Sequence, residues 1–140
     1  MRKCAFLILL VVLNSFGQKY EWSKTVLKLQ QELSSISTSN RKFDIKKDTL
    51  QMALKLSEID KTSYKTIKIP LKKVVSLVAS FNELVLFTRK EKTTDNSYSC
   101  TKVDNSQITI SKPFDREKHT SLIAALRKII AMNRTKKKKQ

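Results

Sequence analysis

The sequence predicts an α+β domain in which one helix precedes, and another follows, a series of antiparallel strands. Near both ends of the chain, apolar residues recur every three or four positions, and between these segments they recur at every second position. The first period is typical of an amphipathic helix and the second of a half-buried strand. No helical segment separates the predicted strands, so we do not expect a parallel sheet, which needs helical crossovers.

The first 17 residues have the pattern of a secretory signal peptide. Two basic residues precede an unbroken apolar run at 4–13, and the small residues Ser15 and Gly17 occupy positions −3 and −1 of a cut before Gln18. The run is shorter than the about 20 residues that a membrane-spanning helix needs. We therefore expect an exported protein, secreted or periplasmic in a Gram-negative-type bacterium. We expect cleavage between Gly17 and Gln18, after which the protein would not be an integral membrane protein; the alternative is an uncleaved N-terminal anchor.

Residues 18–40 are expected to form an amphipathic helix and a linker. The helix is predicted over residues 20–36, because its apolar positions step by four, three, four and three residues and so share one face. Those positions are Trp22, Val26, Leu29, Leu33 and Ile36. The serine-rich run 34–40 ends the helix, because its side chains compete for backbone hydrogen bonds.

About seven strands are predicted next. The clearest alternation is at 50–56, where leucine and methionine take every second position. Turns are expected at residues 47–49 and at Phe81-Asn82, and Pro70 is expected to end the third strand. The predicted strands cover residues 43–45, 50–56, 64–69, 74–79, 83–89, 98–103 and 107–111.

A second amphipathic helix is predicted to close the domain. Asp115 is a good N-cap residue for it, and basic residues lie near its end, where the helix dipole favours positive charge. Its predicted buried stripe consists of Leu122, Leu126, Ile129 and Ile130. Residues 134–140 contain no apolar side chain, and we expect them to form a flexible basic tail.

The order of elements over residues 41–133 resembles the pleckstrin-homology-like superfold. In that fold, seven meandering strands form a partly open barrel and a C-terminal helix plugs one end. The resemblance rests on element order, without a diagnostic motif, and the additional leading helix departs from the simplest form. That helix also admits a helix-grip fold, in which a curved sheet wraps the C-terminal helix and leaves a cavity.

The residue content argues against most catalytic and metal-binding chemistry. The chain has one histidine, His119, and two cysteines, of which only Cys100 lies outside the leader. These cannot form a zinc cluster or an internal disulfide. The single glycine is Gly17, so glycine-rich phosphate loops are excluded. We therefore expect a protein that is not an enzyme and has no catalytic residue, metal or cofactor. The alternative is an enzyme of unrecognised type, which would need His119 to line a pocket together with Asp115 and another acidic residue.

Basic charge is the strongest functional signal. The chain carries 29 basic and 12 acidic side chains, a net charge of +17. Such a charge attracts polyanions, and lysine outnumbers arginine, which suits diffuse attraction. The candidate binding residues are Lys72, Lys73, Arg134, Lys136, Lys137, Lys138 and Lys139.

These observations predict a non-catalytic binding or accessory module whose basic surface contacts anionic lipid, acidic polysaccharide or an acidic protein partner. Sequence-specific nucleic-acid binding is not expected, because no exposed aromatic ladder is evident. The alternative is a carrier of lipid or another small hydrophobic ligand, with a cavity between the sheet and the C-terminal helix. The glycosylation sequon at Asn133 is interpreted as a chance match.

Overall fold

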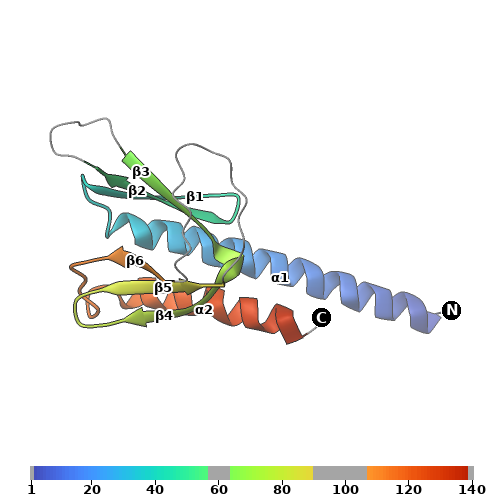
Figure 1. Ribbon diagram of the computed structural model, residues 1–140. Coiled ribbons are helices and arrows are strands. Elements are labelled where there is room, and N and C mark those ends of the chain that lie inside the picture. Colours follow the sequence, from blue (N-terminus) through green and yellow to red (C-terminus); the bar gives the residue numbers. More distant parts are fainter. Residues whose placement is uncertain (1, 57–63, 90–106, 139–140) are drawn as a thin grey trace.

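The computed structural model confirms an α+β fold and describes residues 2–56, 64–89 and 107–138 (Figure 1). The predicted strand at 98–103 lies outside these residues. The elements in chain order are α1 (Arg2–Ser34), β1 (Arg41–Lys46), β2 (Thr49–Lys55), β3 (Tyr64–Pro70), the short 3₁₀ helix η1 (Leu71–Lys73), β4 (Val74–Ala79), β5 (Leu84–Thr88), β6 (Gln107–Ser111) and α2 (Thr120–Lys138).

The six described strands form two separate antiparallel sheets of three strands each, in the orders β1-β2-β3 and β4-β5-β6. The sequence led us to expect one partly open barrel, but no strand pairing joins these two sheets in the part of the chain that the structure describes. The break falls where Pro70 ends β3 and the chain passes through η1 into β4. Proline has no N–H to donate to a sheet and fixes its own φ, which favours a change of direction there.

Each sheet is covered by one helix, and the two helices pack against each other. In Figure 1, α1 runs beneath β1–β3, whereas α2 lies along β4–β6; α1 contacts β1 and α2, and α2 contacts β4 and η1. One continuous apolar core lies between these layers. Its fully buried members include Leu29 and Leu33 of α1, Leu50 of β2, Leu86 of β5 and Leu126 of α2.

The two halves of α1 differ. Trp22, Leu29 and Leu33 are buried as the periodicity predicts, and the helix ends at Ser34. The helix begins at Arg2, however, and its N-terminal half projects beyond both sheets (Figure 1). The described apolar side chains of this half are largely exposed to solvent, with Val11 61% and Phe16 67% exposed. Among the described residues, no helix is long and apolar enough to cross a membrane.

The β1–β2 hairpin is built without glycine. Lys47 and Asp48 form its tip with φ angles of 48° and 60°, the left-handed conformation that a two-residue hairpin turn requires. The register pairs Phe43 with Met52 and Ile45 with Leu50, so the apolar residues share one sheet face as predicted. The alternation does not extend to Leu56, which is 62% exposed beyond the end of β2.

The second helix begins later and ends later than the sequence suggests. Asp115 caps a turn before it, because its Oδ1 accepts the N–H of Glu117 at 3.0 Å and that of Lys118 at 3.3 Å, while α2 itself begins at Thr120. At the other end the helix continues to Lys138, so the tail expected from residue 134 is helical through this residue. Lysine is a good helix former and its charge is favoured at a helix C-terminus.

Candidate anion-binding surface

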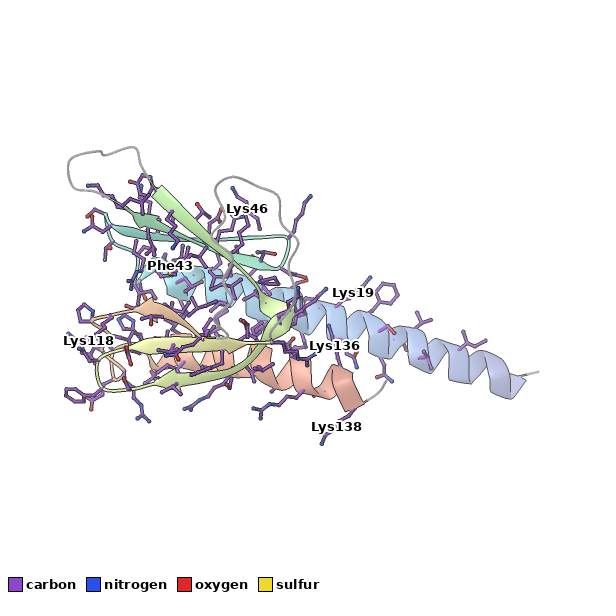
Figure 2. The ribbon with its side chains drawn as sticks, in the orientation of Figure 1. Lys19, Phe43, Lys46, Lys118, Lys136 and Lys138 are labelled. Carbon is purple, nitrogen blue, oxygen red and sulfur yellow. The ribbon has the colours of Figure 1, made fainter. Side chains whose placement is uncertain are left out.

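One end of the domain collects basic side chains from four segments that are distant in sequence. They come from α1, the β1–β2 turn, η1 and the last turns of α2, which meet where the N-terminal half of α1 leaves the domain (Figures 1 and 2). We call this surface the basic end. Figure 2 labels four of its members, Lys19, Lys46, Lys136 and Lys138. The others are Lys47 of the β1–β2 turn, Lys72 and Lys73 of η1, and Arg134 of α2, whose segments are joined by the contacts described below.

A buried amide holds η1 against α2. The side chain of Asn133 is 7% exposed, and its Nδ2 donates to the carbonyl oxygens of Leu71 and Val74, each at 2.9 Å. Both carbonyls flank η1, and that of Leu71 also accepts the backbone N–H of Val74. The clamp therefore fixes Lys72 and Lys73 beside the end of α2. It also supports the interpretation of the sequon as chance, because a glycan would replace one of the two N–H donors of Nδ2 at a buried position.

The β1–β2 turn is joined to η1 by backbone and side chain. The N–H of Leu71 donates to the carbonyl oxygen of Asp48 at 2.9 Å. The Nζ of Lys72 lies 3.6 Å from Oδ2 of Asp48. These contacts bring the lysines of the turn next to those of η1, although more than 20 residues separate them in the sequence.

Two basic residues of α2 are held by contacts outside their own helix. The Nη2 of Arg134 donates to the carbonyl oxygen of Val75 at 3.3 Å, and the Nζ of Lys136 lies 4.9 Å from the ring centroid of Trp22. A cation over an indole ring is attracted by the negative face of the ring. The indole Nε1–H of Trp22 is buried and has no hydrogen-bond partner among the described residues.

Acidic side chains near this surface are fewer than the cations. Asp44 lies 3.4 Å from Lys46, and Glu21 lies 2.8 Å from Lys128 on the adjoining stretch of α2. The hydrogen bond and charge of Lys128 hold the pKa of Glu21 below its ordinary value, so this carboxylate is ionised at neutral pH. With Asp48, three carboxylates of the described residues pair with cations of the basic end or with Lys128, so the described side chains of this surface keep an excess of positive charge.

A small cavity lies between α1 and the end of α2, beside the basic end. Its volume is about 390 Å³, and its lining includes Leu13, Gly17, Trp22, Met132 and Lys136. Most of the lining surface is apolar, and Glu21 and Lys136 add one carboxylate and one ammonium group. The cavity sits where the projecting half of α1 meets the domain, and not between a sheet and α2, where the carrier alternative expects one.

Most of the residues proposed from the sequence are brought together. Lys72, Lys73, Arg134, Lys136 and Lys138 all belong to the basic end. The side chain of Lys137 and all of Lys139 lie outside what the structure describes. Sequence reasoning left Lys19 and the turn lysines out of the candidate set. The only available signal was the position of Lys46-Lys47 at a predicted strand end.

In the described part of the chain, Asp115 and His119 form no hydrogen bond or ion pair with each other. Asp115 is engaged by backbone N–H groups and by Lys118, and the first of these hydrogen bonds, from the N–H of Lys118, is the largest cause that lowers its pKa. His119 instead stacks on Phe114 with ring centroids 5.4 Å apart, and its Nδ1 lies 3.4 Å from Oγ of Ser35. Within the described segments, no group of three or more His, Cys, Asp or Glu side chains could hold a metal ion.

Comparisons of the chain with protein-family models, with curated proteins and with solved structures gave no match.

Proposed function

We propose that this protein is a non-catalytic, exported binding module that docks its basic end on an anionic lipid surface. The observation that carries the proposal is the coincidence of two features at one end of the domain. Cations from four segments gather there, and the apolar half of α1 leaves the domain at the same place (Figure 2). Lysines next to an anionic bilayer each contribute about 1 kcal/mol to binding.

The same end faces the membrane whether or not the leader is removed. With the leader attached, residues 4–13 place an apolar helix in the lipid next to the cations, as interfacial helices do. After cleavage before Gln18, the cations remain with the domain. The core is also retained, because every described core side chain lies between Trp22 and Ile130. We therefore expect the chain from Gln18 to fold and to bind through charge alone.

The test compares two variants with equal loss of charge. In the first, Lys47, Lys72 and Lys138 of the basic end are replaced by glutamine; in the second, the exposed Lys28, Lys42 and Lys118 elsewhere on the domain are replaced. Binding of the chain from Gln18 to vesicles with about one third phosphatidylglycerol is measured by sedimentation. We expect the first variant to bind roughly a hundredfold more weakly and the second to stay within about threefold of the unchanged chain.

A second set of binding measurements varies the salt concentration and the charge of the lipid. Retention on anionic vesicles should disappear between about 50 mM and 500 mM salt, because the Debye length shortens and screens the lysines. Neutral phosphatidylcholine vesicles should retain only the complete chain with its leader. Equal losses in the two triple variants, or binding that resists high salt in the chain from Gln18, would contradict docking through the basic end. Preference for heparin over anionic vesicles would assign the surface to a polysaccharide instead.

A further inference from the structure

A second cavity lies at the opposite end of the domain, away from the basic end. It forms where the α1–β1 connection, the end of β2 and the segment between β6 and α2 meet, near Lys118 in Figure 2. Its volume is about 650 Å³. Its lining includes Thr38, Arg41, Lys55, Lys112, Phe114 and His119.

The charge of this cavity is one-sided. Arg41, Lys55 and Lys112 contribute three cations and His119 contributes an imidazole, and no carboxylate side chain is among the lining residues that belong to the described part of the chain. The Oε2 of Glu83 lies 4.0 Å from Nζ of Lys112, at the outer edge of ion-pair range. A concave site lined by several cations concentrates a positive potential, because field lines are focused in a cleft.

Arg41 has two roles, because its guanidinium joins the two sheets and also has further N–H donors that can bind a ligand. It is half-buried, and its Nη1 donates to the carbonyl oxygen of Ile110 at 2.9 Å, which ties β1 to β6 across the two sheets. This bond uses one of several N–H donors of the guanidinium. The other donors keep the planar arrangement that matches carboxylate and phosphate oxygens.

The backbone around Arg41 is fixed by a closed set of hydrogen bonds. The N–H of Thr38 donates to the carbonyl oxygen of Arg41 at 2.8 Å, and the N–H of Arg41 lies 3.1 Å from Oγ1 of Thr38. The N–H of Lys55 donates to the carbonyl oxygen of Asn40 at 2.9 Å. The backbone that carries Arg41 and Lys55 is therefore fixed before a ligand binds. Ordering these two side chains around a ligand costs less entropy than ordering a whole loop.

Apolar and neutral polar groups complete the lining. Phe114 is buried and stacks on His119, while Leu54 supplies an aliphatic surface. The Oγ of Ser35 donates to the carbonyl oxygen of Glu32 at 2.6 Å and lies 3.4 Å from Nδ1 of His119. This mixture suits a small organic body that carries an oxyanion, and it differs from the all-lysine surface at the other end.

We propose that this cavity binds a small organic oxyanion, with its phosphate or carboxylate held by Arg41 between Lys55 and Lys112. The site is distinct from the basic end and does not depend on the lipid-docking proposal. The ligand lies between the two sheets' edges, so its binding also stabilises the contact between them.

The experiment titrates the full chain with glucose 6-phosphate, citrate and neutral glucose by isothermal calorimetry. We expect saturable binding of at least one of the two anions at concentrations up to about 5 mM, and none of glucose. Glucose 6-phosphate alone identifies a phosphate site and citrate alone a carboxylate site. Absence of binding by both anions would overturn the proposal, and so would equal binding of glucose.

Three variants locate the binding. Arg41→Lys keeps the charge but removes the planar donors, and it should weaken the affinity for the bound anion at least tenfold; Lys55→Gln should weaken it about fivefold. Arg127→Gln, an exposed arginine of α2 outside the cavity, is the matched control and should leave the affinity within about twofold. Equal losses in Arg41→Lys and Arg127→Gln would contradict the site. Vesicle binding of Arg41→Lys should be unchanged, which separates this result from the lipid-docking test, and Lys55→Gln tests the site if Arg41→Lys fails to fold.

Discussion

The two ends of the domain carry similar charge but hold it in different ways. At the basic end the structural connection is a neutral, buried amide, Asn133, and the cations around it are surface side chains. At the opposite end the connection between the sheets is itself a cation, the half-buried Arg41. Exposed lysines act over a distance and are screened by salt, whereas a partly buried guanidinium acts at contact range. The comparison indicates a broad docking surface at one end and a local binding site at the other.

The largest effect is expected from breaking the clamp of the basic end. Asn133→Ala removes one donor from each of the carbonyl oxygens of Leu71 and Val74 and opens a small cavity, while the Leu71 carbonyl keeps the backbone N–H of Val74. Because each lost hydrogen bond costs about 0.5–1.5 kcal/mol and the cavity adds to this loss, we expect the free energy of unfolding to fall by about 2–3 kcal/mol. Urea denaturation followed by circular dichroism measures it. The control Asn82→Ala, in the exposed β4–β5 turn, should change the free energy of unfolding by less than about 0.5 kcal/mol. Equal losses of stability in the two variants would contradict the role of Asn133 in holding η1 against α2.

Replacing single lysines by glutamine is expected to have the next largest effect and distinguishes the two ends of the domain. Lys72→Gln or Lys138→Gln should each weaken vesicle binding about fivefold, and the double variant should show the product of both factors, since well-separated exposed charges act additively. Lys112→Gln, at the cavity, should leave vesicle binding within about twofold. Sedimentation at low salt provides the readout. A larger effect from Lys112 than from Lys72 would reverse the assignment of the two ends.

A smaller effect is expected at the tip of the β1–β2 hairpin. Lys47 has a φ of 48°, which a lysine adopts less readily than asparagine does. Lys47→Asn should therefore raise the free energy of unfolding by about 0.5–1 kcal/mol, while vesicle binding drops slightly because one cation is lost. Thermal unfolding tests the first part. A destabilised variant would contradict the left-handed turn in the described hairpin.

The smallest effect concerns the ion pair that joins the helices beside the basic end. Its Lys128 lowers the pKa of Glu21 in the folded protein. A lowered folded-state pKa contributes stability above the unfolded-state pKa, and this contribution is lost as the pH falls through the folded-state value. Lys128→Gln should thus make the acid-side loss of stability slightly shallower. Urea midpoints between about pH 3 and pH 6 measure it, with Arg127→Gln as the control. A steeper acid-side loss in Lys128→Gln would contradict the pair.

Local patterns predicted the elements but not how they assemble. The 3.6-residue stripe of Leu122 and Leu126 and the alternation from Leu50 to Leu54 identified a helix and a strand, because burial on one face imposes those periods. The division into two sheets depends on strand pairings across the chain, which no local period encodes. The helical end of α2 was missed because its lysines lack an apolar stripe, although contacts to Trp22 and Val75 hold this segment.

The candidate sites show the same limit. Asn133 follows Ile129 and Ile130 at the helical spacing of the buried stripe, a signal that a buried amide rather than a surface sequon occupies this position. The cavity has no comparable signal. Arg41, Lys55 and Lys112 have no characteristic spacing in the sequence. The β1–β2 pairing brings Lys55 next to Arg41, and the contact between β1 and β6 brings the segment of Lys112 to them.

The orientation of the domain on a bilayer tests the central claim most directly. Two single-cysteine variants of the chain from Gln18, with Cys100 replaced by serine, carry an environment-sensitive fluorophore either at position 47 or at position 81, the β4–β5 tip where Phe81 is 98% exposed. Fluorescence is read on anionic vesicles that contain a lipid-borne quencher. Docking through the basic end predicts quenching of the probe at position 47 and little change at position 81. Quenching at position 81 alone would show that the opposite end faces the membrane, and equal quenching would show that no end is preferred.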